Sequence, residues 1–175
     1  GELLDLMKRA GFKAINISLV STSDSLRSAM GRPRGVADFS TVLDTAEKTG
    51  LNVVAYAILG MPGQTIEDMM DTVGYLMGRK VLVGPSIYYP VPGTALFETC
   101  REEGVLPRCA SQYRSSAVPI ETGDFSRLDL ITLFRLVRAV NFIKGKIDEK
   151  VLPEDINLHD LDLLLREKSG IKDDP

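Results

Sequence analysis

The sequence predicts an α/β fold in which three parallel strands alternate with helices. Short apolar runs recur along the chain, and after each run a glycine or proline turn opens an amphipathic helix. The predicted strands are residues 13–20, 52–59 and 86–89. The predicted helices are residues 2–10, a short helix that ends at 29, and residues 38–49, 66–77, 95–103 and 127–146.

The chain is expected to divide into three parts. Residues 1–104 hold the βα units, and residues 105–125 have the composition of an irregular linker. Residues 126–175 form a helical extension, in which Ser126 and Asp129 predict a capping box and a last helix is expected around 158–167.

The first helix begins without a preceding strand. Its apolar face is made by Leu3, Leu4, Met7 and Ala10. The chain also starts with Gly1 rather than methionine, so we expect it to be a fragment of a longer protein.

The strand at 13–20 has one apolar and one partly polar face. Ile15, Ile17 and Leu19 alternate with Asn16 and Ser18. In a β/α barrel the outer face meets helices, so the polar face would point into the cavity. The alternative is an edge strand whose polar face lies in water.

Residues 52–71 organise the chain. The strand at 52–59 is largely apolar, which predicts that both of its faces are buried. Gly60, Pro62 and Gly63 end it, and Thr65 with Asp68 predicts a capping box. A glycine loop before a helix can present backbone N–H groups to a ligand, unless its glycines serve the turn alone. The predicted buried face of the helix comprises Ile66, Met69, Met70, Val73, Leu76 and Met77.

Two further patterns precede this stretch. The helix at 38–49 is predicted to bury the apolar residues Phe39, Val42, Leu43 and Ala46. In the loop before it, Arg32 and Arg34 could hold an anionic group, although solvated arginines are the commoner case.

Composition argues against several classes of protein. The 175 residues carry a formal net charge of -3 and no long basic run, so we expect no nucleic-acid surface. No apolar run is long enough to span a membrane and no signal peptide is visible, which favours a cytoplasmic protein with two free thiols. No nucleophile–base pair is apparent, and the single histidine, His159, is expected on the surface.

Three stretches in order resemble the second half of the radical S-adenosylmethionine (SAM) core. They read LLDLMKRAGFKAINISLVSTSDSLRSAMGRPRG, NVVAYAILGMPGQT and SIYYPVPGTALFE. The likeness is greatest to the branch that often carries a preceding cobalamin-binding domain, and residues 113–147 resemble the extension after the core in that branch.

The resemblance implies a partial six-stranded parallel β/α barrel, TIM-like, of which this chain holds strands four to six. It also implies SAM and a [4Fe–4S] cluster in the parent protein. The family's CxxxCxxC cluster loop is missing here, and Cys100 and Cys109 match no part of it. The fragment itself is therefore expected to be inactive.

By the same resemblance, six positions contact the cofactor. Ser18 and Ser21 fall near the ribose and methionine moieties, and Ile58, Gly60, Gly63 and the backbone around Tyr89 fall near the adenine. Two positions depart from the family pattern. Val20 replaces the usual ribose-contacting carboxylate, and Gln64 stands where glutamate is common and is expected to keep a capping role.

The leading hypothesis is a piece of a radical SAM enzyme that cleaves SAM reductively to a 5′-deoxyadenosyl radical and acts on an unknown substrate. The alternatives are a non-catalytic βα binding module, which Val20 favours, and a phosphate-handling enzyme that uses the loop at 60–65. A half-barrel would leave the first strand, residues 13–20, with an unpaired edge, which predicts self-association through that edge or its partial burial by the C-terminal tail.

Overall fold

The computed structural model describes residues 1–32, 34–155, 157 and 160. The chain forms two compact units, residues 1–138 and 139–175, whose boundary falls within the long C-terminal helix. The helix predicted around 158–167, and with it His159, lies outside the described residues. The predicted division at 104 and 125 therefore stays a prediction.

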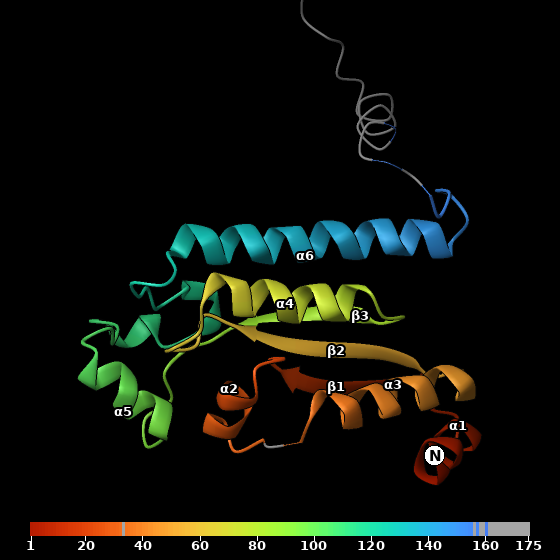
Figure 1. Cartoon of the computed structure of the whole chain (residues 1–175), viewed down its shortest axis with the longest axis horizontal. Helices are drawn as coiled ribbons and strands as arrows, with labels where there is room; N and C mark the ends of the chain where they lie inside the picture. The colour runs from red at the N-terminus through yellow and green to blue at the C-terminus, as the bar shows by residue number, and fades with distance from the viewer. Residues whose placement is uncertain (33, 156, 158–159, 161–175) are drawn as a thin grey trace, which may run out of the picture. The chain divides into compact units, whose positions relative to one another are not determined.

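Unit 1 is built on a three-stranded parallel sheet in the order β1-β2-β3 (Figure 1). The strands are β1 (Ala14–Val20), β2 (Asn52–Leu59) and β3 (Leu82–Ile87). Parallel strands need crossover connections, and helices supply them here. The predicted α/β class with three βα units is confirmed.

The helices follow the predicted order. Their bounds are α1 Glu2–Arg9, α2 Asp24–Ala29, α3 Val36–Thr49, α4 Ile66–Met77, α5 Ala95–Glu102 and α6 Arg127–Asp148. Two 3₁₀ turns, η1 (Ala110–Gln112) and η2 (Ser115–Ala117), lie in the segment predicted as a linker.

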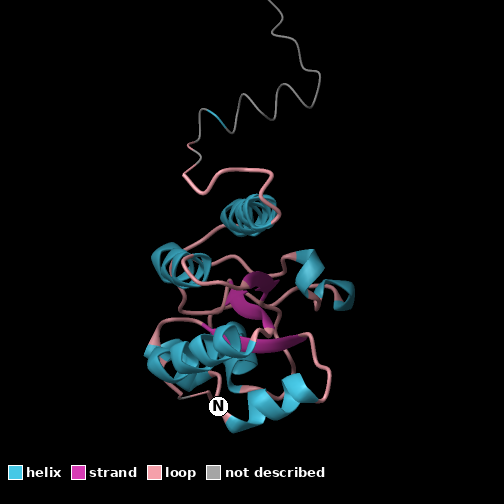
Figure 2. Ribbon diagram, turned by 90° about the vertical axis from the view of Figure 1, so that its right-hand side faces the viewer, coloured by secondary structure: helices cyan, strands magenta, loops and turns pink. Residues whose placement is uncertain are grey.

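Helices α3 and α4 pack against one face of the sheet (Figure 2). On that face β2 contributes Val53, Ala55, Ala57 and Leu59, all of them buried. The opposite face is open among the described residues, and Tyr56 and Leu82 are exposed on it. The prediction that both faces of β2 are buried is therefore wrong, because no layer formed by the described residues covers the second face.

The third strand differs from its prediction. The expected strand at 86–89 begins four residues earlier, at Leu82, and ends at Ile87. Gly84 and Pro85 resemble a break in the sequence, yet both lie within β3. Proline is tolerated there because β3 is an edge strand, on which one side of the backbone needs no ladder bond.

Two predicted apolar faces are only partly buried. In α3, Leu43 and Ala46 are buried, whereas Phe39 is half-buried and Val42 is exposed. In α4, Met70 is 55% exposed. Polar Thr72 occupies the buried stripe instead, three residues after Met69, because its hydroxyl has partners inside the protein.

Both predicted capping boxes are present. At the start of α4 the Thr65 N–H donates to the Asp68 carboxylate, and the Asp68 N–H donates to the Thr65 hydroxyl. At the start of α6 the N–H and hydroxyl of Ser126 donate to Asp129 at 2.8 and 2.7 Å, and both hold the pKa of Asp129 below its usual value. The Asp129 N–H donates back to the Ser126 hydroxyl at 3.2 Å.

Helix α6 buries Leu130, Leu133 and Val137 in unit 1. In unit 2, the Lys146 ammonium group donates to Glu149 at 2.6 Å and lies 5.7 Å from the centre of the Phe142 ring. Among the described residues, no helix has the length and apolar character needed to cross a membrane.

Candidate functional site

Three loops follow the carboxyl ends of the three strands, which lie at one edge of the parallel sheet. They comprise residues 21–23, 60–65 and 88–94. In parallel α/β folds, ligands bind at this edge. All six positions expected to contact a cofactor lie in these loops or in the last residues of the strands.

The loop after β2 is stabilised by one buried amide side chain. The Gln64 carbonyl oxygen accepts the N–H groups of Gly60 at 2.8 Å and Met61 at 3.1 Å, and its amide donates to the Ile58 carbonyl at 3.2 Å. Gln64 is fully buried. The expected helix-capping role of Gln64 is not seen, because Thr65 and Asp68 cap α4 while Gln64 holds the strand end and the loop together.

The two glycines of this loop have different surroundings. Gly60 has φ +81° and lies against Leu130 of α6, where an added methyl group would approach Cδ1 to 2.8 Å. Gly63 has φ +72°, is exposed, and has no heavy atom within 4 Å of the same position. Gly60 therefore serves both the turn and the packing of α6, whereas Gly63 serves the turn and leaves open space beside it.

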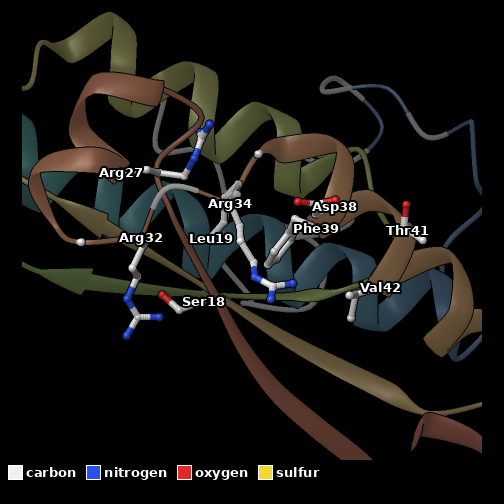
Figure 3. Close-up of a pocket in the computed structure, with 11 residues that line it drawn as sticks. Ser18, Leu19, Arg27, Arg32, Arg34, Asp38, Phe39, Thr41 and Val42 are labelled. Carbon is white, nitrogen blue, oxygen red and sulfur yellow. The ribbon is translucent and has the colours of Figure 1, made fainter. Parts of the chain in front are cut away.

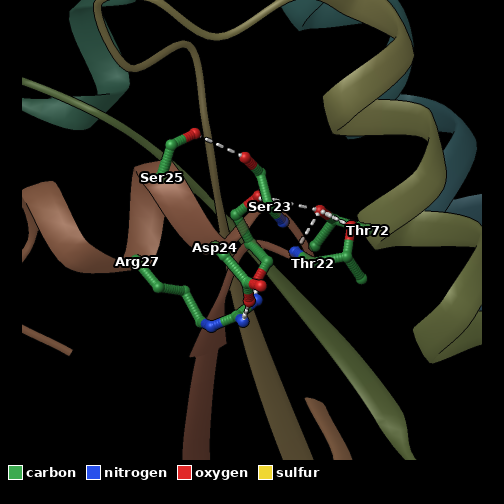
Figure 4. Close-up of polar contacts among 7 residues, drawn as sticks. Thr22, Ser23, Asp24, Ser25, Arg27 and Thr72 are labelled. Carbon is green, nitrogen blue, oxygen red and sulfur yellow. Dashed lines mark hydrogen bonds and ion pairs between the residues drawn. The ribbon is translucent and has the colours of Figure 1, made fainter. Parts of the chain in front are cut away.

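The loop after β1 is attached to α4 by hydroxyl groups (Figure 4). The Thr72 hydroxyl accepts the Thr22 N–H at 2.9 Å and lies 3.1 and 3.3 Å from the hydroxyls of Thr22 and Ser21. The Ser21 oxygen also accepts the Ser23 N–H at 3.1 Å. The hydroxyl of Ser21, an expected cofactor contact, is thus fully buried with protein partners.

Val20 has an unusual backbone conformation. Its φ is +72°, which is rare for a β-branched residue and costs about 1–3 kcal/mol. The pairing of β1 with β2 shifts register between Ser18 and Val20, and the Val20 side chain is 1% exposed. At the position where the family resemblance expects a carboxylate, this chain has an apolar side chain inside the core.

The remaining expected site residues border the open face of the sheet. Ser18 pairs in register with Tyr56, and Ile58 pairs with Ser86. Ser18 and Ile58 are half-buried, and Tyr89, just beyond β3, is 41% exposed. These side chains are accessible to a ligand over the carboxyl ends of the strands.

A cavity of about 540 Å³ runs along the free edge of β1 (Figure 3). Ser18 and Leu19 line one side of it, and Phe39 and Val42 of α3 line the other. It also contains cationic side chains, Arg27, Arg32 and Arg34.

Only one of these three arginines is buried. The Arg27 guanidinium donates to the Ser21 carbonyl at 2.9 Å, pairs with Asp24, and points away from those of Arg32 and Arg34 in Figure 3. Arg32 and Arg34 are exposed and extend on the same side as Ser18. Sequence reasoning identified the exposed pair and missed Arg27, although its i, i+3 spacing from Asp24 is a signal of pairing.

The cysteines do not fit a [4Fe–4S] cluster. Such a cluster takes several thiolate ligands, and this chain has two cysteines, of which Cys100 is buried in α5 and Cys109 is exposed. No group of three or more potential metal ligands occurs in the part of the chain that the structure describes. The residues present therefore cannot hold the cluster.

The comparisons with known proteins agree with this arrangement. The profile of the Radical SAM superfamily matches residues 1–76. The chain is 35% identical over 86 residues to the human threonylcarbamoyladenosine tRNA methylthiotransferase. This match covers 46% of this chain and 14% of that protein. The corresponding Xenopus laevis protein is 34% identical over 86 residues.

One solved structure has a similar fold over most of the chain. It is the archaeal Methanocaldococcus infernus Elp3 with an N-terminal deletion, with a TM-score of 0.53 and 17% sequence identity. The match covers 82% of this chain and 39% of that one, so the chain spans well under half the length of the proteins it matches. Residues 1–76 are therefore similar in sequence to the Radical SAM superfamily, and the solved structure shares the fold of the chain.

Proposed function

We propose that this chain is part of a radical SAM enzyme whose substrate is RNA. The observation that carries the proposal is the superfamily match over residues 1–76, joined to 35% identity with tRNA methylthiotransferases over 86 residues. SAM bound at a reduced iron–sulfur cluster supplies a 5′-deoxyadenosyl radical in such enzymes. An upstream cobalamin-binding domain stays a prediction from the family resemblance.

The strand-end residues of this chain would shape one side of the cofactor pocket. Ile58 offers an apolar surface next to the adenine, and Ser18 offers a hydroxyl nearby. The N–H of Gly60 already donates to Gln64, so it is not a free donor for the cofactor. Gly60 would instead allow the cofactor to approach the backbone closely, because it has no side chain. The Ser21 hydroxyl, bound to Thr72 and Ser23, would hold the β1 loop in place.

The isolated 175-residue chain should lack radical activity, because its two cysteines cannot hold the cluster. Anaerobic reconstitution of this chain with iron and sulfide, followed by desalting, should leave no iron–sulfur absorbance. A retained cluster would contradict this expectation.

The full-length gene product provides the main test. After reconstitution, reduction and addition of SAM, mass spectrometry should detect 5′-deoxyadenosine, and bulk tRNA should increase its formation. If the cofactor is cleaved but tRNA has no effect, the RNA part of the proposal is wrong. If no cluster forms and SAM is not cleaved, the chain belongs to a non-catalytic relative.

We also propose that the isolated chain self-associates through the free edge of β1. Among the described residues this edge has no strand partner, and Phe12 and Val42 are 51% and 38% exposed. Unpaired strand edges beside apolar side chains recruit further strands. Light scattering should show concentration-dependent dimers that Val42→Lys weakens, and a strict monomer at high concentration would contradict the proposal.

A further inference from the structure

A second cavity lies at the opposite edge of the sheet, between β3, η2 and α6, and its volume is about 460 Å³. Its apolar surface comes from Ile87 of β3, Val118 after η2, and Ile131 and Phe134 of α6. All of these residues belong to unit 1. An apolar cavity that opens beside an edge strand can accept a flat ring without displacing a strand partner.

The polar side chains of this cavity can all donate hydrogen bonds. Arg135 and Arg138, three residues apart on α6, present two guanidinium groups, and Ser115 and Ser116 present two hydroxyls. Both arginines are exposed, and neither has an ion-pair partner within the described part of the chain. No acidic residue lines the cavity, so its chemistry suits an anionic oxygen such as that of a phosphate.

The cavity adjoins the expected cofactor position. Ser86, which lines it, pairs in register with Ile58, the expected adenine contact. Leu130, one residue before the cavity residue Ile131, packs on Gly60 of the β2 loop. A ligand held in this cavity would therefore lie next to the carboxyl edge of the sheet, where the chemistry of the family takes place.

We propose that the β3–α6 cavity binds a nucleotide of the RNA substrate, with a phosphate on Arg135 and Arg138 and the base against Phe134 and Ile131. This inference rests on the proposed RNA substrate and names the surface that holds it. The net charge of -3 averages over the whole chain and does not describe a local pair of unpaired arginines.

The test is RNA binding by the 175-residue chain itself. Fluorescence anisotropy with a fluorescein-labelled, mixed-sequence single-stranded RNA would compare the wild type with Arg135→Ala/Arg138→Ala. The control variant is Arg9→Ala/Arg101→Ala, which removes the same charge from α1 and α5, away from the cavity. Circular dichroism and thermal unfolding would verify that both variants fold.

The cavity variant should bind the RNA about 10- to 100-fold more weakly than the control variant. The magnitude of its slope of log K against log salt should fall by about 0.7, because one single-strand phosphate contact is lost. Ile131→Ala should weaken binding without changing that slope. The proposal would be overturned if both variants bound RNA as tightly as the wild type. It would also be overturned if both lost the same affinity, because that would indicate a response to net charge alone.

The outcome separates this inference from the proposed function. If tRNA stimulates SAM cleavage by the full-length protein while the cavity variant of the chain binds RNA normally, the function stands and this site is wrong. If the chain binds inorganic phosphate at the cavity but not RNA, the nucleotide assignment is overturned.

Discussion

The ring of Tyr56 lies over Gly84, its register partner on the neighbouring strand: a methyl group at position 84 would come within 2.7 Å of the ring carbons Cδ1 and Cε1. Tyr56 is 39% exposed, and the ring lies on the open face of the sheet. The φ of Gly84 is not in the left-handed region, so its backbone conformation does not require glycine. Glycine is required there because a side chain would collide with the ring of Tyr56.

Gly84→Ala should lower the free energy of unfolding by about 1 kcal/mol, because the added methyl group displaces the Tyr56 ring. In a Tyr56→Ala background the same substitution should instead stabilise by about 0.5–1 kcal/mol, since alanine is favoured over glycine within a strand. Urea unfolding of the wild type, the two single variants and the double variant gives the coupling free energy between positions 56 and 84. Additive effects would show that the ring does not determine the glycine.

Gln64→Leu should destabilise the protein by about 2 kcal/mol or more, because the N–H groups of Gly60 and Met61 would lose their buried acceptor. The control is Gln112→Leu. Gln112 also accepts a backbone N–H, from Cys109 at 3.3 Å, but it lies at an exposed turn, so its loss should cost less than about 0.5 kcal/mol. Equal losses in the two variants would contradict this account of Gln64.

Gly60→Ala and Gly63→Ala separate backbone strain from packing. Both alanines would have a positive φ, which should cost about 1 kcal/mol. Only Gly60→Ala also meets Leu130, so it should cost at least about 1 kcal/mol more. In a Leu130→Ala background the extra cost should disappear from chemical unfolding curves, and its persistence would mean that α6 does not constrain this loop.

Thr72→Val should destabilise the protein by about 1–3 kcal/mol, because it keeps the shape of the side chain and removes the acceptor of the Thr22 N–H. The control is Thr41→Val in α3, where the hydroxyl donates to the Ala37 carbonyl at an exposed position. That change should be nearly neutral. Amide hydrogen exchange should also show faster exchange of residues 21–23 in Thr72→Val, and unchanged protection would contradict the attachment of this loop to α4 through Thr72.

Alkaline pH should weaken the fold through two buried groups that lie together. Burial raises the pKa of Tyr88 above its ordinary value of 10.0, with a further contribution from Cys100, and burial also raises the pKa of the Cys100 thiol above 9.0. Both groups keep their protons in the folded state and lose them more readily when unfolded. The free energy of unfolding should therefore be unaffected by them below about pH 8 and should fall as pH rises above about 9.

Unfolding curves across that pH range test this. Cys100→Ala should reduce the alkaline loss, whereas Cys109→Ala should follow the wild type because Cys109 is exposed. In the native protein a thiol reagent should modify Cys109 first, and Cys100 only after unfolding. Rapid modification of both thiols in the folded protein would contradict the burial of Cys100.

Much of the fold could be predicted because its signals are local. The capping boxes at Thr65 and Ser126 and the helical periodicity of 66–77 depend on residues within a few positions of each other. The order of strands and helices predicted the parallel sheet, and the motif resemblance predicted the similarity to the Radical SAM superfamily that the profile match over residues 1–76 shows. The expected cofactor contacts at Ser18, Ser21, Ile58, Gly60, Gly63 and Tyr89 stay predictions, although all six lie at the carboxyl edge of the sheet.

The sequence by itself determined the order of strands and helices, the two capping boxes, and that two cysteines cannot hold the cluster. Only the tertiary structure decided that β3 continues through Gly84 and Pro85, that Thr72 belongs in the core, and that Arg135 and Arg138 share a cavity with η2. The physical reason is the separation along the sequence between the residues that interact. Caps and periodicity arise from neighbours along the chain, whereas each of these outcomes depends on a partner from a distant segment, which no local pattern specifies.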